Sequence, residues 1–134
     1  MSWYEKSEIE NSRINDIILS YDLNREVIVE ARLNGEVEEL ISESAEKFKL
    51  IFEDRNIELT VYHVIPFWRN GELIEDNCGT VQVGDELLCI DPEELTVRKE
   101  KIVEIELGMT DNTPVRHPKS SNGYYFVNGI LLHD

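Results

Sequence analysis

The side chains best suited to proton transfer lie at the end of this 134-residue chain. An aromatic pair, an Asn-Gly turn and three large aliphatic residues, within positions 124–132, lead into His133 and Asp134. Aliphatic residues beside a free chain end would fray into solvent unless they were buried. The pattern therefore predicts a buried strand that delivers His133 and Asp134 to a fixed place. This makes the last peptide bond of a longer precursor the point of interest.

A second pair, Thr60 and His63, stands at the end of a segment whose alternating apolar residues predict a strand. Side chains three positions apart on a strand point to opposite faces of the sheet. Thr60 and His63 can therefore converge on one atom only if the strand breaks between them. The irregular segment 64–66, which ends in proline, favours such a break.

At the other end of the chain, the hydroxyl group of Ser2 is a candidate nucleophile. A serine hydroxyl is a poor nucleophile unless a base or a polarised acyl group assists it. The plain alternative is that Ser2 is an ordinary serine near a chain end and has no chemical role.

The remaining reactive side chains suggest no site of their own. Cys89 lies in an apolar run and is predicted to be a small buried strand residue, whereas Cys78 is predicted to be a loop thiol. Without a Cys-x-x-Cys pair, a zinc site built on cysteine pairs is not expected. A disulfide is not needed, so a reducing compartment such as the cytoplasm is expected. His117 is predicted to be a surface-loop histidine.

The elements that must position these residues are short strands separated by turns. Alternating or β-branched runs predict strands at 17–19, 26–33, 47–63, 85–90, 96–107 and 124–132. Turn chemistry stands at 21–25, 34–35, 54–56, 69–72, 91–94 and 128–129. The spacing before residue 47 allows at most one helical turn, and 109–122, with two of the four prolines, is expected to be a loop. The sum predicts one all-β domain over residues 1–134.

The charge balance argues against two classes of partner. Lys and Arg total 13 against 28 Asp and Glu, a formal net charge of −15, and a surface of that sign repels phosphate backbones and anionic membranes. No apolar run approaches the roughly 18–20 residues that span a bilayer. Nucleic acid and membrane are therefore not expected as partners.

The C-terminal pattern resembles the closing motif of inteins and of the wider hedgehog/intein (Hint) family. In that motif two aromatic residues, a small residue, Asn-Gly and three aliphatic residues precede His-Asn. Gly129 and His133 match it, and Asp134 stands where the family has Asn. Thr60 and His63 resemble the second conserved motif, although two residues separate the histidine from the proline that usually follows it directly.

The opening and the middle of the chain carry further matches. Ser2, Ser7 and Ile9 fit the opening motif of the family, but the Gly-Asp that precedes its Thr is missing. The segment 83–87 resembles the Val-Gly-Asp strand start, and Gly123 replaces a histidine of the penultimate motif. The short distance between the motifs leaves no room for a homing endonuclease, so the resemblance is to a minimal form and covers essentially the whole chain.

The resemblance implies a pseudo-twofold all-β horseshoe that brings both termini together, and self-catalysed protein splicing. Ser2 would attack the carbonyl of residue 1 and turn an amide into an ester, while Thr60 and His63 stabilise the oxyanion and protonate the departing amine. The downstream junction would break when the side chain of residue 134 attacks its own main-chain carbonyl with help from His133. An Asn forms a succinimide in this step. Asp134 would form an anhydride, at a rate that depends on its protonation.

The implied partners are the flanking extein segments of a host protein, together with a complementary intein fragment if the domain comes from two genes. Neither a metal nor a cofactor is implied. Two alternatives stay open. The first is a Hint autoprocessing domain that cleaves without ligating, and the second is an acidic, non-catalytic β domain that binds other proteins.

Overall fold

Strands make up almost all the regular structure of this chain. The computed structural model describes the backbone of residues 16–40, 46–109 and 114–134, and their side chains except those of 35–40, 109 and 114–118. The elements in these ranges are β1 (Ile17–Asp22), β2 (Val27–Leu40), β3 (Glu46–Ile51), β4 (Asn56–Thr60), β5 (Val64–Arg69), β6 (Glu72–Asn77), the 3-10 turn η1 (Cys78–Thr80), β7 (Glu86–Asp91), β8 (Thr96–Lys101), β9 (Glu104–Met109), β10 (Pro114–Ser120), β11 (Tyr124–Val127) and β12 (Ile130–His133). The expected all-β class is confirmed.

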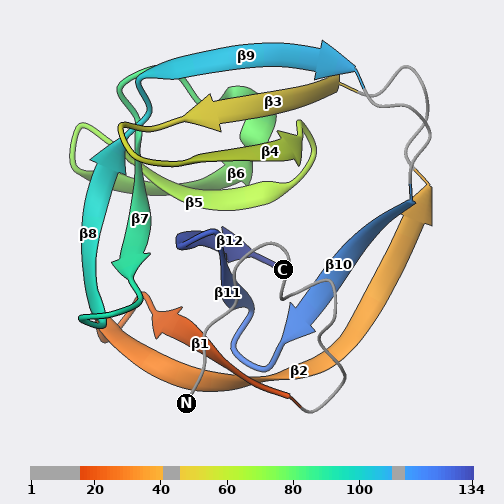
Figure 1. Ribbon diagram of the computed structural model, residues 1–134, viewed down its shortest axis with the longest axis vertical. Helices are drawn as coiled ribbons and strands as arrows, with labels where there is room; N and C mark the ends of the chain where they lie inside the picture. The colour runs from red at the N-terminus through yellow and green to blue at the C-terminus, as the bar shows by residue number, and fades with distance from the viewer. Residues whose placement is uncertain (1–15, 41–45, 110–113) are drawn as a thin grey trace.

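The described strands form three antiparallel sheets. Two are three-stranded, in the orders β1-β2-β10 and β4-β3-β9, and each joins a hairpin from the first half of the chain to a strand from the second half. The third has the order β11-β12-β7-β5-β6, with β8 paired to β7. In Figure 1, β12 lies near the centre of the molecule with a three-stranded sheet on either side. The predicted closeness of the two termini concerns residues before 16 and lies outside the described ranges.

The last strand is buried on both faces. Ile130 and Leu132 are 0% and 2% exposed and belong to the larger hydrophobic cluster, whereas Leu131, at 0%, belongs to a second cluster with Phe126. The alternation of side chains along a strand sends successive residues into different clusters. The predicted burial of the aliphatic run before His133 is confirmed.

Two Asn-Gly turns close hairpins as predicted. Asn70 and Gly71, between β5 and β6, have φ of 53° and 81°, and Asn128 and Gly129, between β11 and β12, have φ of 50° and 73°. Two consecutive residues with positive φ make the tight turn whose twist matches that of paired strands, and Asn and Gly adopt that backbone conformation at least cost. The second of these turns sets the register that places Tyr124 opposite His133.

A third Asn-Gly pair does not form a turn. Asn34 and Gly35 lie inside the long strand β2, and the predicted turn there is wrong. Lys119 of β10 pairs with Gly35 and Ser120 pairs with Leu33, so Asn34 is the extra residue of a β-bulge. The same strand continues to residue 40, where the sequence allowed a helical turn. Residues that suit a turn also suit a bulge, and only the partner strand decides between them.

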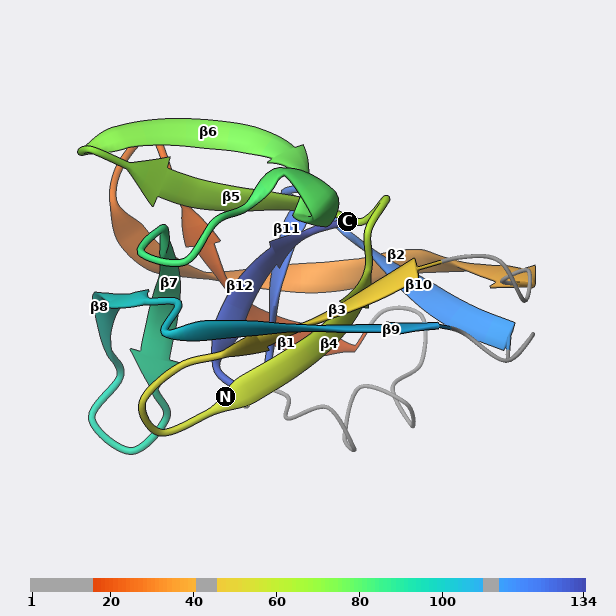
Figure 2. The ribbon, with the colours of Figure 1, turned by 90° about the horizontal axis from the view of Figure 1, so that it is seen from above.

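The expected loop at 109–122 is also corrected, because its second half is the strand β10. This strand is at the edge of its sheet and pairs only with β2 within the described chain, so its two prolines need not donate to a second neighbour. β10 and β2 run side by side away from the six-stranded sheet (Figure 2). His117 therefore lies on a strand, opposite Val37, and not in a loop.

Both cysteines are buried and free. Cys89, 1% exposed on β7, confirms the prediction of a small buried strand residue. Cys78, predicted to be a loop thiol, lies in the 3-10 turn η1 between β6 and β7 and is 0% exposed there. Burial raises the pKa of each thiol to about 12, with the charge of Glu100 adding to the rise at Cys89. Both thiols stay protonated near neutral pH and are poor nucleophiles.

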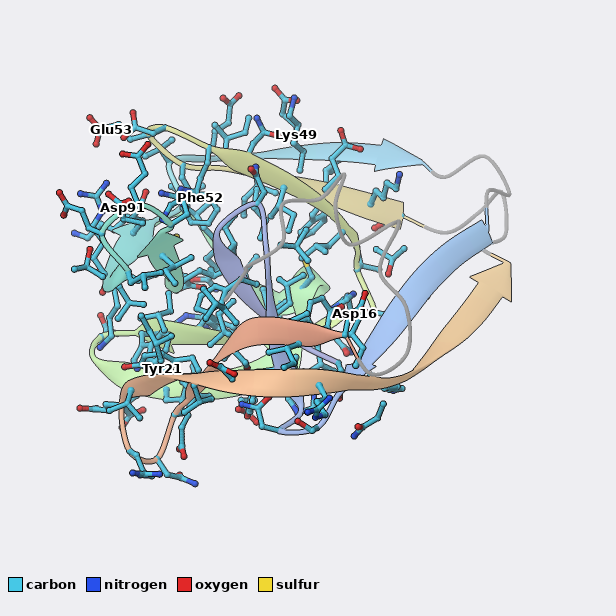
Figure 3. The ribbon with its side chains drawn as sticks, turned by 60° about the horizontal axis from the view of Figure 1, so that its bottom comes forward. Asp16, Tyr21, Lys49, Phe52, Glu53 and Asp91 are labelled. Carbon is cyan, nitrogen blue, oxygen red and sulfur yellow. The ribbon has the colours of Figure 1, made fainter. Side chains whose placement is uncertain are left out.

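Acidic side chains lie mostly on the surface, as Glu53 and Asp91 do at the rim of the molecule in Figure 3. Among the described carboxylates Asp85 is the buried one. Arg69 donates to both of its oxygens, at 2.9 and 2.7 Å, and the amide of Gln82 donates at 2.8 Å. Although burial raises the pKa of Asp85, these hydrogen bonds outweigh it and hold the pKa below its usual value. The predicted Gly-Asp corner before β7 thus depends on an ion pair.

Replacing Asp85→Asn is expected to lower the free energy of unfolding by about 2 kcal/mol, because charged hydrogen bonds to Arg69 are lost. A carboxylate with a lowered folded-state pKa stabilises above its unfolded pKa, near ~4, and this contribution disappears as the pH falls further. Urea unfolding of both proteins from pH 7 to pH 3 measures the difference. The matched control is Asp54→Asn, since Asp54 and Arg98 are 4.0 Å apart with side chains 69% exposed and should contribute little. An equal loss in both variants would contradict this account.

Candidate active site

His63 lies in a tight turn directly after β4. The strand ends at Thr60, and the His63 amide donates to the Thr60 carbonyl over 3.1 Å, which closes a four-residue turn. The break that the pair requires is therefore present. Thr60 is buried, at 7% exposure, and His63 is half-buried.

The ring of His63 reaches the last strand. Its Nε2 is 3.0 Å from the carbonyl oxygen of His133, although seventy positions separate the two residues. A carbonyl oxygen can only accept a hydrogen bond, so this contact requires the proton of His63 on Nε2. The fold thus links two of the predicted site residues through the peptide group that joins His133 to Asp134.

The ring of His133 turns toward the carbonyl of the next residue. Its Nδ1 is 2.8 Å from the main-chain oxygen of Asp134 and 3.8 Å from the side-chain Oδ1 of that residue. In this structure that oxygen belongs to the α-carboxylate of Asp134 and stands in for the carbonyl of the peptide bond to a following residue. Either group can only accept, so the contact requires the proton of His133 on Nδ1, where it would polarise that carbonyl. Two histidines therefore donate to two successive main-chain oxygens.

Backbone groups also hold Asp134 from the other side. Its amide donates to the carbonyl of Gly123 over 2.9 Å, and its Oδ2 accepts from the amide of Ser120, also over 2.9 Å. The amide, the side chain and the carbonyl of Asp134 each have a partner. A side chain held in this way has fewer conformations to sample, which favours an intramolecular attack.

Asn122 organises the segment that holds Asp134, and the sequence did not single it out. Its Oδ1 accepts from Ser120 Oγ at 2.9 Å and from the Tyr124 amide at 3.2 Å, and it lies 2.9 Å from Ser20 Oγ. Its Nδ2 donates to the Tyr21 carbonyl over 3.2 Å. One side chain thus connects β10, β11 and β1. The only signal for it was a Ser-Ser-Asn-Gly run, which is typical of any turn.

Tyr124 covers the ring of His133. The ring centroids are 4.9 Å apart with an interplanar angle of 74°, an edge-to-face contact. The Tyr124 hydroxyl donates to Glu75 on β6. Burial, and then the Glu75 carboxylate, raise the pKa of Tyr124, so the phenol keeps its proton. Glu75, Tyr124 and His133 therefore form a connected set.

The structure brings together His63, His133 and Asp134, with Thr60 in the turn that carries His63. Ser2 lies outside the described residues. Within the described ranges, no three or more His, Cys, Asp or Glu side chains are grouped to hold a metal ion, and no helix is long and apolar enough to cross a membrane.

Replacing Asn122→Ala is expected to reduce the free energy of unfolding by about 1–3 kcal/mol, since the Ser120 hydroxyl and the Tyr124 amide lose their acceptor. Thermal and urea unfolding measure the loss. Asn24→Ala, in the exposed β1–β2 turn, is the matched control and should change stability little. A neutral Asn122→Ala variant would mean that these groups find other partners.

Comparison with known proteins identifies the fold. No protein-family model matches the chain, and no curated protein matches its sequence. An intein from a hyperthermophile matches with a TM-score of 0.78 at 17% identity, over 88% of this chain and 71% of its own. A bacterial intein-like domain from Clostridium thermocellum matches with a TM-score of 0.73 at 22% identity, over 94% and 86%. A transcription factor IIB mini-intein matches with a TM-score of 0.71 at 18% identity, over 92% and 74%. The predicted Hint-type fold is confirmed.

Proposed function

We propose that residues 1–134 form a single intein-type domain that cleaves, and in the right host splices, its own backbone. The observation that supports this most is the convergence of His63 and His133 on the carbonyls of the last two residues, at 3.0 and 2.8 Å. Enzymes that act on other molecules need a site open to substrate. Here the groups that would react belong to the chain itself, and its own sheet positions them.

In the proposed downstream step, His133 donates from Nδ1 to the carbonyl oxygen of Asp134, and the side chain of Asp134 attacks the carbonyl carbon. A five-membered ring closes, the bond to the following residue breaks, and the departing amine takes a proton. With a carboxyl nucleophile the ring is a cyclic anhydride, which water opens to regenerate Asp. With an amide nucleophile it is a succinimide. The succinimide is a stable imide, whereas the anhydride is an activated acyl group that the departing amine can reopen, so Asp134 is expected to make this step slow.

In the proposed upstream step, the hydroxyl of Ser2 attacks the carbonyl of residue 1 and expels its own amine, which gives an ester. Thr60 and His63 are the residues we assign to stabilising the oxyanion and protonating that amine. The support for His63 is its position beside the last strand, where its Nε2 lies 3.0 Å from the His133 carbonyl oxygen. In the Hint arrangement that the resemblance implies, the opening residue meets this end of the chain, so one imidazole would serve both junctions. Ser2 is assigned on its match to the opening motif alone.

The partners of such a domain are the segments of a host protein that flank it, and a complementary fragment if the domain is made as two pieces. We propose no cofactor and no metal. The free, buried and protonated thiols are compatible with the cytoplasm. Cleavage without ligation is the second candidate, and it is supported by the fold that the chain shares with a bacterial intein-like domain.

The test is Asp134→Asn in a fusion with reporter proteins at both ends and Cys after position 134. The rate of downstream cleavage is expected to rise about tenfold or more, which corresponds to an activation free energy lower by about 1.4 kcal/mol. The Ser120 amide now bonds Oδ2. It can instead bond the new amide oxygen, which leaves the amide nitrogen free to attack. Gel electrophoresis and mass spectrometry measure cleaved and ligated products. A ligated product supports splicing, and downstream cleavage alone supports the second candidate. No product from either fusion would favour a non-catalytic acidic domain.

Replacing His133→Ala in the same Asp134→Asn fusion is expected to slow downstream cleavage by about 100-fold or more, because the carbonyl loses its donor. Single-turnover rates from gel densitometry measure the effect. His117→Ala is the matched control, since its backbone pairs with Val37 on β2 and no motif assigns it a role. Equal rates for the two variants would remove His133 from the mechanism.

A further inference from the structure

We propose that the segment from Glu75 to Gly79, on β6 and η1, is a positioning element that aligns both histidines of the candidate active site. The contacts are independent of any reaction, and only the consequence for cleavage rests on the proposed function. No residue of this segment matched a motif in the sequence. It acts on His63 through two backbone hydrogen bonds and on His133 through one aromatic side chain.

Two backbone hydrogen bonds from η1 hold the turn that carries His63. The amide of Cys78 donates to the carbonyl of His63 over 2.8 Å, and the amide of Gly79 donates to the carbonyl of Val61 over 2.9 Å. Together with the bond from the His63 amide to the Thr60 carbonyl, they fix the turn on two sides. With only its internal hydrogen bond, a four-residue turn could tilt relative to the neighbouring strands. The two hydrogen bonds from η1 restrict that movement.

The anchoring of η1 gives this contact its rigidity. The side chain of Cys78 is 0% exposed within the larger hydrophobic cluster, so one end of η1 is held by the core. At the other end, Arg69 donates to the carbonyl of Thr80 over 3.1 Å while it pairs with Asp85. The turn of His63 therefore rests on a support that is fixed at both ends.

Gly79 is the residue that permits this close approach. A Cβ atom at position 79 would lie 3.0 Å from the Cβ of Val61 and 3.3 Å from its carbonyl oxygen. Those separations are shorter than ordinary van der Waals contact. An alanine would push the turn away by a few tenths of an ångström, and the His63 ring with it. The backbone φ of Gly79 is not in the positive range, so the requirement is one of space.

The same segment also reaches His133, through Tyr124. Four residues before Gly79, the Glu75 carboxylate accepts a hydrogen bond from the hydroxyl of Tyr124, whose ring makes an edge-to-face contact with the His133 imidazole. Tyr124 and His133 are also paired across β11 and β12. The hydrogen bond to β6 limits rotation of the tyrosine ring, which in turn limits the ring it covers.

The contacts to His63 and those to His133 bear on the two histidine–carbonyl distances of the candidate site. His63 must keep Nε2 near the His133 carbonyl, and His133 must keep Nδ1 near the Asp134 carbonyl. Because Glu75, Cys78 and Gly79 belong to one short segment, a shift of that segment would move both rings. A misplacement of about 1 Å far from the reacting atoms can cost roughly 100-fold in rate.

The test uses the Asp134→Asn fusion as parent, at a temperature where every variant is folded by circular dichroism. Gly79→Ala is expected to slow downstream cleavage about tenfold, whereas Gly108→Ala, where a Cβ meets nothing within 4 Å, should match the parent. Glu75→Ala and Tyr124→Phe are expected to slow it about threefold, and Glu75→Gln should restore the parent rate because its amide oxygen still accepts. Glu72→Ala, on the same strand, is the matched control and should have no effect.

A second measurement reports ring positions without any reaction. Long-range proton–nitrogen NMR of the three imidazoles should show the proton of His63 on Nε2 and that of His133 on Nδ1 in the parent. Gly79→Ala should change the imidazole nitrogen signals of His63, and Glu75→Ala should change those of His133. The signals of His117 should stay unchanged and serve as the internal reference. Unchanged rings together with parent rates would overturn the proposal. If these variants change the imidazole signals although the parent fusion does not cleave, the positioning role is upheld and the proposed function is contradicted.

Discussion

The double burial of β12 is the constraint on which the candidate site depends. Ile130, Leu131 and Leu132 are buried in two different clusters, and each contributes about 1.5–3 kcal/mol relative to an exposed position. Just before the strand begins, Arg55 donates to the Gly129 carbonyl over 3.3 Å and so holds its N-terminal end. A strand held on both faces and at its start cannot slide. The backbone of His133, the last residue of the strand, is thereby held as firmly as that of the buried residues before it.

Main-chain groups supply most partners in the site. The carbonyls of His133 and Asp134 accept from the two histidine rings, and the amide of Ser120 and the carbonyl of Gly123 hold Asp134. Such distances follow from the pairing of strands, which is stiffer than the rotamer of a long side chain. This suits a domain whose proposed substrate is its own backbone, because the sheets that stabilise the fold also preorganise the reacting groups.

Buried and half-buried polar side chains connect the site to the rest of the fold. Asp85 holds the corner before β7 through Arg69, which also bonds the end of η1. Asn122 links three strands beside Asp134. Each group is costly to bury alone and is satisfied by several hydrogen bonds. Their effect is specificity: they allow one arrangement of the strands around the chain's last residues.

The sequence by itself determined the all-β class, the two hairpin turns at Asn70 and Asn128, and the buried strand that leads into His133, because these follow from local backbone preferences and from the alternation of apolar residues. The bulge at Asn34 and the strand at 114–120 were decided by pairing between remote segments, which leaves no local pattern. The same holds for the contact of His63 with the last strand and for the role of Gly79. Their partners are backbone atoms, which every residue carries, so only the tertiary structure shows which of them meet.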